Sequence, residues 1–234
     1  MGHSTESKPW LPFTDRHDAG LRLALKLRHM RTPSQPTGTN PAVVLGLSRG
    51  GVPIAAEVAA VLGLPLGVLV ARKLGVPGSP EVAFGAVATY GGFTHLSHLP
   101  FVLDHLRRDG YTLAELDAVE AAERGELARQ QALFVRGAQP PVSGRTVLLC
   151  DDGLATGATM RAALNLMREV GAGAVHVCVP AAPAVTCREL AALADEVTCL
   201  QPWPAMHAVS EAYLRFEQVN DATVLAVLAG ANRP

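Results

Sequence analysis

The sequence predicts an α/β protein built on a Rossmann-like open parallel sheet of about five strands, with helices on both faces. Short apolar runs that are typical of buried strands lie at 41–47, 64–71, 146–150, 174–180 and 196–200. Helical patterns separate most of these runs, and such alternation favours parallel strands that are covered on both faces. Open parallel sheets bind ligands at the edge where their strands end, so the segments after each run are the candidates for function.

Length and composition predict a single domain over residues 1–234. Of the 234 residues, 49% are hydrophobic and 18% are charged, which is typical of a globular protein with one sizeable core. We expect an α/β core over 13–200, a helical insertion at about 94–141 and an appended tail over 201–234. The longest apolar region, 52–71, is divided by Glu57, prolines and glycines into a helix and a strand, which argues against a membrane span.

Charge and cysteine usage narrow the class of protein. With 20 Lys and Arg against 21 Asp and Glu, and no basic run, the sequence gives no sign of binding nucleic acid or an anionic membrane. The N-terminal residues lack the apolar core of a signal peptide. None of the four cysteines forms a C-x-x-C pair. We therefore expect buried thiols in a cytoplasmic protein, with metal ligation by cysteine as a less favoured alternative.

The stretch at 145–161, R-T-V-L-L-C-D-D-G-L-A-T-G-A-T-M-R, organises the chain. Its strand ends in two adjacent carboxylates, Asp151 and Asp152, and a turn of small residues leads into a helical pattern. The turn consists of Gly153, Leu154, Ala155, Thr156, Gly157, Ala158 and Thr159, the last of which we expect to cap the helix. Such a turn lets backbone N–H groups and the helix dipole face one phosphate, whereas carboxylates suit the hydroxyls of a sugar. The stretch therefore predicts a ribose 5-phosphate site, with solvent-facing aspartates as the alternative.

Two other strand ends carry residues suited to anions. The S-R-G-G turn after the strand at 41–47 consists of Ser48, Arg49, Gly50 and Gly51. Its glycines free the backbone for close approach, and its arginine supplies a fork of N–H donors. Arg72 and Lys73 follow the strand at 64–71, although Lys73 could also be simply solvated. The three turns would meet at one edge of the sheet.

Between these turns the sequence predicts a mobile loop and a long helix. Residues 75–80 are rich in glycine and proline and should be mobile, and Glu81 opens a further strand after them. Glu81 either contacts substrate from this loop or is a plain surface carboxylate. Thr112 and Glu115 form a capping box for a mixed-charge helix at 113–135. We interpret that helix as a solvated face, with a lid or a dimer contact as alternatives.

The turns resemble motifs of the type I phosphoribosyltransferases. Two acids before T-G-x-T are similar to that family's phosphoribosyl pyrophosphate (PRPP) motif. The S-R-G-G turn resembles the pyrophosphate loop of xanthine-guanine phosphoribosyltransferases. This second resemblance implies a cis peptide at Ser48–Arg49. The R-K-x-G pattern at Arg72–Lys73 is similar to the place where cations meet pyrophosphate in adenine and orotate phosphoribosyltransferases. The whole chain resembles bacterial stand-alone phosphoribosyltransferase-domain proteins, whose F-x-D-R-x-x-A-G start is Phe13, Asp15, Arg16, Ala19 and Gly20 here.

This resemblance implies transfer of the 5-phosphoribosyl group from PRPP to a small nitrogen heterocycle in nucleotide metabolism, with release of pyrophosphate. It implies that Arg49 and Arg72 neutralise the pyrophosphate together with Mg²⁺. Asp151 and Asp152 would hold the ribose diol and meet the Mg²⁺ directly or through water. The tail at 201–234 would be the family's hood, where Trp203 either stacks on the acceptor or anchors the core. We expect a homodimer.

Two other functions stay open from the sequence. Some members of the family bind PRPP as a signal, so a non-catalytic PRPP-binding regulator is the first alternative. The residues G-L-S-R-G also fit the nucleophile elbow of α/β-hydrolases, with Ser48 as nucleophile and His207 and Asp151 or Asp195 as partners. That elbow normally follows several strands, whereas a single predicted strand precedes Ser48, so the hydrolase is the less favoured alternative.

Overall fold

A single mixed sheet forms the centre of the computed structural model, which describes residues 10–30 and 42–231. Its strands, in the order β4-β3-β2-β1-β5-β6-β7, are β1 (Val43–Leu47), β2 (Leu66–Val76), β3 (Ser79–Tyr90), β4 (Phe93–His98), β5 (Thr146–Cys150), β6 (Ala174–Pro183) and β7 (Glu196–Trp203). The five strands from β2 to β7 in this order run parallel to one another, whereas β3 and β4 pair antiparallel at one end. The α/β fold class is confirmed, and two antiparallel strands extend the expected five-stranded sheet.

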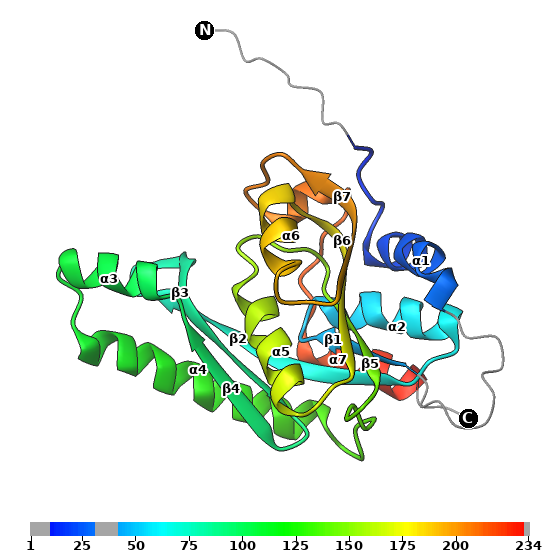
Figure 1. Cartoon of the computed structure of the whole chain (residues 1–234), viewed down its shortest axis with the longest axis horizontal. Helices are drawn as coiled ribbons and strands as arrows, with labels where there is room; N and C mark the ends of the chain where they lie inside the picture. The colour runs from blue at the N-terminus through cyan, green and yellow to red at the C-terminus, as the bar shows by residue number, and fades with distance from the viewer. Residues whose placement is uncertain (1–9, 31–41, 232–234) are drawn as a thin grey trace, which may run out of the picture.

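Helices cover both faces of the sheet (Figure 1). The helices are α1 (Arg16–Lys26), α2 (Gly51–Leu62), α3 (Pro100–Arg108), α4 (Leu113–Phe134), α5 (Ala158–Glu169), α6 (Ala184–Leu190) and α7 (Asp221–Ala231), with short 3₁₀ turns at Arg28–Met30 and Val209–Ala212. One apolar core joins α1, α2, α4 and α7 to the sheet, and a second core lies under α5 and α6. Within 10–30 and 42–231, no helix is both long and apolar enough to cross a membrane.

The two central strands bring the candidate site to one edge of the sheet. Alternation along β5 sends Leu148 into the first core and Val147 and Leu149 into the second, so both faces of the strand are buried. The parallel register pairs Gly46 with Cys150. Because β1 and β5 end at nearly the same level, the turns that follow them begin side by side.

A hairpin replaces the mobile loop that the sequence predicts at 75–80. Strand β2 continues to Val76 and β3 begins at Ser79, so only Pro77 and Gly78 connect the two strands. Gly78 has a φ of 76°, a left-handed conformation that favours glycine in tight turns. The long strands therefore reach past the parallel core as a two-stranded ribbon, and the predicted loop is wrong.

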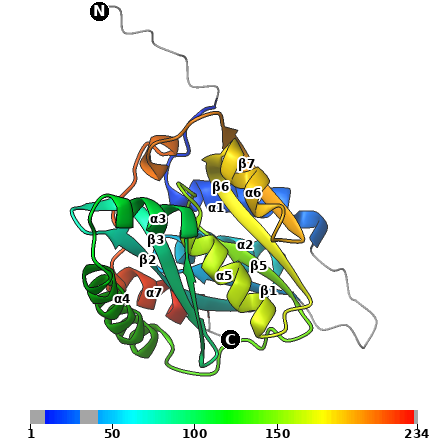
Figure 2. The same ribbon diagram turned by 60° about the vertical axis from the view of Figure 1, so that its left-hand side comes forward.

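The insertion begins with a strand and continues as two helices. Gly91 and Gly92, with φ values of 59° and 87°, connect β3 to the unpredicted strand β4. Helix α4 has the predicted capping box, in which Thr112 and Glu115 bond reciprocally. Figures 1 and 2 show α4 along the β2–β3 ribbon, and its contacts there bury apolar side chains, so it is more than a solvated face.

The C-terminal tail is divided between the edge and a face of the sheet. Helix α7 packs against α2 and α4 and adds Val224 and Leu228 to the core, so it is not an appended lobe (Figure 2). Residues 204–220 instead run past the carboxyl edge. There, Tyr213 forms a parallel bridge with Phe13, and the Leu214 amide donates to the Phe13 carbonyl at 2.8 Å. Only this stretch of the predicted tail lies where a hood would lie.

Candidate active site

Two of the predicted turns touch through their glycines. A Cβ placed on Gly50 would overlap the Asp152 carboxylate, and one on Gly51 would overlap the Cys150 carbonyl oxygen. Since any side chain at these positions would separate the turns, glycine is required for close approach rather than for a special dihedral angle. The S-R-G-G turn and the acidic pair therefore form one site.

Asp152 is held by two segments that lie far apart in the sequence, one around Arg16 and one around Tyr213. The Arg16 Nε and Nη2 atoms lie 2.8 and 2.7 Å from its Oδ2 atom, and the hydroxyl of Tyr213 donates to its backbone carbonyl at 2.5 Å. Arg16 also donates to the Glu217 carbonyl at 2.6 Å, and its guanidinium carbon lies 3.9 Å from the ring centroid of Phe216. The Asp152 side chain is 12% exposed, so this arginine supplies most of its charge compensation.

Without a ligand, the adjacent carboxylates of Asp151 and Asp152 are electrostatically unfavourable. Burial raises the pKa of Asp151 well above its usual value, and the neighbouring charge of Asp152 raises it further. Burial also raises the pKa of Asp152, although Arg16 opposes this effect. The Asp152 amide donates to Asp151 Oδ1 at 2.9 Å and so fixes that carboxylate. A ligand that brings hydroxyl donors or a cation would relieve the pair.

A cleft of about 480 Å³ lies against this site. Its lining joins predicted and unpredicted residues from β1, β2, β5 and both ends of the described chain: Arg16, Arg49, Gly50, Arg72, Asp152, Val209, Phe216, Gln218 and Val219. A larger hollow of about 890 Å³ lies at the opposite edge of the sheet, around Leu66 and Arg136, and contains no residue of the acidic pair. The smaller cleft is therefore the candidate active site, because it contains Asp152 together with Arg49 and Arg72.

The turn after Asp152 has the shape that the sequence predicts, with two corrections. Gly157, at a φ of 72°, is the residue that precedes α5, so it replaces Thr159 as the N-cap. Leu154 donates its amide to the Ala181 carbonyl at 3.0 Å and its side chain is 2% exposed, so it is a structural residue rather than a phosphate donor. Ala155 and Thr156 are exposed, and the Thr186 hydroxyl supports the Ala155 carbonyl at 3.1 Å.

Arg72 and Lys73 lie within β2, which continues to Val76, rather than at the strand end that the sequence predicts, and one of the two lines the cleft. Successive side chains on a strand point to opposite faces, so Arg72 faces α4 and the cleft while Lys73 faces away. Arg72 Nε donates to Glu123 Oε2 at 2.7 Å. Lys73 Nζ lies 3.8 Å from Glu81 Oε2, and the Glu81 side chain is 95% exposed. Lys73 and Glu81 therefore lie at the surface and outside the lining of the cleft, and their contact with substrate stays a prediction.

The Ser48–Arg49 peptide bond is cis, as the resemblance implies. The Ser48 hydroxyl donates to the Gln130 side-chain oxygen at 3.4 Å. A side-chain amide cannot accept a proton as a general base, and among the described hydrogen bonds of Ser48 Oγ no histidine takes part. The arrangement required for a serine hydrolase is therefore not found at this turn.

The aromatic residue at the cleft is Phe216 and not Trp203. Trp203 is 4% exposed within the first core and donates its ring N–H to Gln201 at 3.3 Å, so it fits the interpretation as a core anchor. Phe216 is half-buried and lines the cleft. Sequence reasoning missed Phe216, Tyr213 and the role of Arg16. For Arg16 a signal existed, because it is the arginine of the F-x-D-R start.

The carboxylates of Asp151 and Asp152 can supply some, but not all, of the ligands of a metal ion. Within the residues that the structure describes, no group of three or more His, Cys, Asp or Glu side chains is placed to hold a metal. Mg²⁺ commonly binds through one or two carboxylates together with water and phosphate oxygens. Asp151 and Asp152 therefore fit a Mg²⁺ ion that is shared with a phosphate ligand, rather than one held in a cage of protein ligands.

The fold and the acid-bearing turn after β5 define this chain as an α/β protein of the type I phosphoribosyltransferase class. A family model described as "Phosphoribosyl transferase domain" matches residues 25–214, and the chain belongs to this family. The M. tuberculosis strains CDC 1551 and H37Rv each have a protein named "Putative phosphoribosyl transferase" that is 42% identical over 222 residues, or 94% of this chain and 47% of theirs. The chain thus spans about half the length of these curated relatives.

A solved structure has the same fold. The crystal structure of the protein TT1426 from Thermus thermophilus superposes with a TM-score of 0.71 at 38% identity. The match covers 94% of this chain and 99% of that one. The whole architecture, including the insertion that carries α4, therefore has a counterpart in a similar protein.

Proposed function

We propose that this protein transfers the 5-phosphoribosyl group from PRPP to a nitrogen acceptor and releases pyrophosphate. One observation carries the proposal: the Asp152 carboxylate lies directly over Gly50, so this member of the acidic pair and the S-R-G-G turn line a single cleft together with Arg72. PRPP has a diol, a pyrophosphate and a 5-phosphate on one ribose, and a cleft of this composition offers acceptors for the first and cations for the second.

The proposed roles follow from charge. Asp151 and Asp152 accept hydrogen bonds from the ribose hydroxyls, and the turn at 155–159 donates to the 5-phosphate. As the bond between C1 and the pyrophosphate oxygen breaks and the bond from C1 to the acceptor nitrogen forms, positive charge builds on the ribose and negative charge on the leaving group. The carboxylates stabilise the first charge, and Arg49 and Arg72 stabilise the second.

Mg²⁺ fits this proposal as a partner of the substrate. Held by Asp151 and Asp152, directly or through water, it would supply further neutralisation of the pyrophosphate. The protein's own contribution is to orient the ribose and to keep the arginines on the side where the pyrophosphate departs.

We also propose that the acceptor is a planar heterocycle that packs against Phe216. This ring lies in the cleft beside Asp152 and is already part of a stack with Arg16, so a flat ligand can extend that stack. The segment that carries Phe216 would then act as the hood, in place of Trp203.

A second candidate is a protein that binds PRPP without turning it over. One observation favours it: the sole carboxylate among the cleft-lining residues, Asp152, is paired with Arg16, so the lining offers no unpaired base to accept a proton from the acceptor. Such a protein would keep the diol and pyrophosphate contacts and report PRPP concentration to a partner.

Pyrophosphate release separates these candidates. The purified chain is incubated with Mg-PRPP and single purines, pyrimidines or other nitrogen heterocycles, and calorimetry measures Mg-PRPP binding in parallel. Release with one class of acceptor supports the transferase, whereas binding without release by any acceptor supports the sensor. If the chain neither binds Mg-PRPP nor releases pyrophosphate, the proposed function is wrong.

A further inference from the structure

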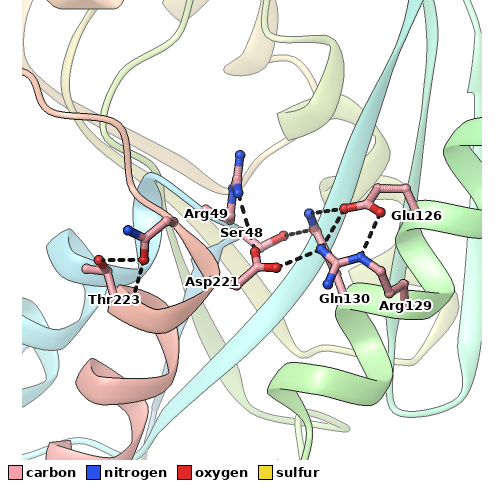
Figure 3. A network of polar contacts seen from close by, with 8 residues as sticks. Ser48, Arg49, Glu126, Arg129, Gln130, Asp221 and Thr223 are labelled. Atoms are coloured by element: carbon pink, nitrogen blue, oxygen red, sulfur yellow. Dashed lines mark hydrogen bonds and ion pairs between the residues drawn. The ribbon is translucent and has the colours of Figure 1, made fainter.

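Two arginines from distant parts of the chain share one carboxylate beside the cleft. Asp221, the first residue of α7, accepts from Arg49 Nη1 at 3.3 Å through Oδ1 and from Arg129 Nη2 at 2.7 Å through Oδ2 (Figure 3). Arg49 belongs to the S-R-G-G turn, whereas Arg129 is on the insertion helix α4. Asp221 thus joins the turn, the insertion and the tail at a single point.

The position of Asp221 is fixed by the start of its helix. The side chain of Asn220 accepts from the Thr223 amide at 2.9 Å and from the Thr223 hydroxyl at 3.1 Å, as an N-cap does. A negative side chain in the first turn also interacts favourably with the helix dipole. Asp221 is therefore presented to the arginines by a rigid element.

A second set of contacts ties Arg129 to the same turn. Arg129 binds both oxygens of Glu126 at 2.8 Å, and the Gln130 amide donates to Glu126 at 3.0 Å. Gln130 is 1% exposed and accepts from Ser48, so it fixes α4 against the turn (Figure 3). The bond from Arg129 lowers the pKa of Glu126 to about 2, so this carboxylate stays ionised.

Arg49 and Arg129 converge on one anionic group, the Asp221 carboxylate, from two sides. A carboxylate that receives one guanidinium on each oxygen has the bridging arrangement in which two arginines grip a phosphate group. Besides Arg16, three arginines near the turn already face carboxylates: Arg49 with Asp221, Arg72 with Glu123, and Arg129 with both Asp221 and Glu126. The three arginines and three carboxylates sum to no net charge, although the leaving group of PRPP is a polyanion.

We propose that Arg129 is a third pyrophosphate-binding arginine, contributed by the insertion, and that Asp221 is an internal competitor that holds its place until pyrophosphate displaces it. This inference rests on the proposed function and assigns to it a residue on α4 and a residue on α7. Neither Arg129 nor Asp221 lines the cleft as described, because Asp221 lies between Arg129 and Arg49, which does line it.

Displacement is physically accessible at this place. The side chains of Asp221 and Arg49 are 26% and 30% exposed, so water and salt reach the pair and weaken it relative to a buried one. A pyrophosphate brings several charges to the same guanidinium groups and can replace one carboxylate. Asp221 would then lower the affinity for pyrophosphate and favour its release after transfer.

Binding of Mg-pyrophosphate to single variants, measured by calorimetry, tests the inference. Asp221→Asn gives the cluster one net positive charge, so we expect it to bind Mg-pyrophosphate about tenfold more tightly than the unaltered chain. Arg129→Gln should bind about tenfold more weakly. Arg124→Gln, on the same helix and paired with Glu120, is the matched control and should bind unchanged. A gain of affinity is informative because misfolding cannot produce it.

The outcomes distinguish this inference from the proposed function. If the unaltered chain binds Mg-PRPP and Mg-pyrophosphate but Asp221→Asn binds Mg-pyrophosphate no more tightly, Asp221 does not compete with pyrophosphate. The transferase proposal then stands. If Arg129→Gln binds like the Arg124→Gln control, Arg129 is not a pyrophosphate residue. If circular dichroism shows that Asp221→Asn has lost helix, the binding test is repeated with Asp221→Ser. Serine also suits the start of a helix. No binding of either ligand to the unaltered chain overturns both proposals.

Discussion

Arg16 lies across the carboxylate of Asp152, 136 positions further along the chain, with Nη2 2.7 Å from Oδ2. Both side chains are 12% exposed, so little water screens the pair. The neighbouring Asp151 adds a second, half-buried carboxylate to the same place. Arg16 is therefore the residue that compensates most of the charge of Asp152 at this edge of the sheet.

We predict that Arg16→Gln destabilises the fold by about 3 kcal/mol, because removing one partner of a buried ion pair leaves the other charge uncompensated. Urea unfolding at pH 7 measures the effect. Arg107→Gln, which breaks an exposed pair with Asp104, is the control and should change the free energy of unfolding by less than about 0.5 kcal/mol. Equal effects of the two substitutions would show that Arg16 does not compensate the acidic pair.

Asp152→Asn should weaken Mg-PRPP binding or turnover at least tenfold, or by about 1.4 kcal/mol, since an amide presents one oxygen and no charge to the ribose hydroxyls. Calorimetry and pyrophosphate release measure the two quantities. Asp117→Asn, an exposed position on α4, serves as the control for a lost carboxylate. Wild-type binding and turnover in Asp152→Asn would argue strongly against the ribose site.

The stability of the ligand-free chain should depend on pH through Asp151. Burial and the charge of Asp152 raise its folded pKa above the usual 3.8, so the folded state holds a proton that the unfolded state releases. Between these two pKa values, the free energy of unfolding therefore falls as the pH rises. Asp151→Asn cannot ionise, so we expect it to be more stable than the unaltered chain at pH 8, by about 1 kcal/mol.

Unfolding in urea at a series of pH values from 5 to 8 checks this sign. The advantage of Asp151→Asn should shrink as the pH falls towards the ordinary range of a carboxylic acid. A difference that stays constant across the series would mean that the Asp151 carboxylate is not strained by its surroundings.

Gly50→Ala and Gly125→Ala should have opposite effects. A Cβ at Gly50 would overlap the Asp152 carboxylate, so the two turns must move apart, at a cost of about 2 kcal/mol and with loss of Mg-PRPP binding. A Cβ at Gly125 meets nothing within 4 Å on α4, where alanine should stabilise the helix by about 0.5–1 kcal/mol. Thermal unfolding and calorimetry report both effects, and a neutral Gly50→Ala would refute the close approach.

The parallel core can be predicted from the sequence because its signals are local. Thr146–Cys150 is short, apolar and followed by turn residues, and the same is true of Val43–Leu47. The edge strand Phe93–His98 has no comparable signal, since it is mostly exposed or half-buried and its residues do not alternate. The Gly91–Gly92 pair before it was the available clue, because both residues adopt the positive φ of a hairpin turn.

The residues of the candidate site also fall into those that the sequence predicts and those that it does not. The sequence predicts the acids and the glycines, since each follows directly from a strand end. Which aromatic residue faces the cleft cannot be predicted, because Trp203 and Phe216 differ only in the path that the chain takes after β7. Likewise, Leu154 loses its amide to Ala181 on β6, a partner that no local pattern reveals. Mg²⁺, the acceptor and the homodimer stay predictions.

The bridge between Phe13 and Tyr213 has a consequence for how the protein is made. A ribosome that has produced every strand of the sheet has still not produced the residues that pair with Phe13, support Arg16 and bond the Asp152 carbonyl. A nascent chain of that length can collapse around its apolar strands and yet lack the contacts that position Arg16 and Asp152. The contacts around Asp152 therefore form only after every strand has been made, when residues 213–217 leave the exit tunnel and reach Phe13, Arg16 and Asp152.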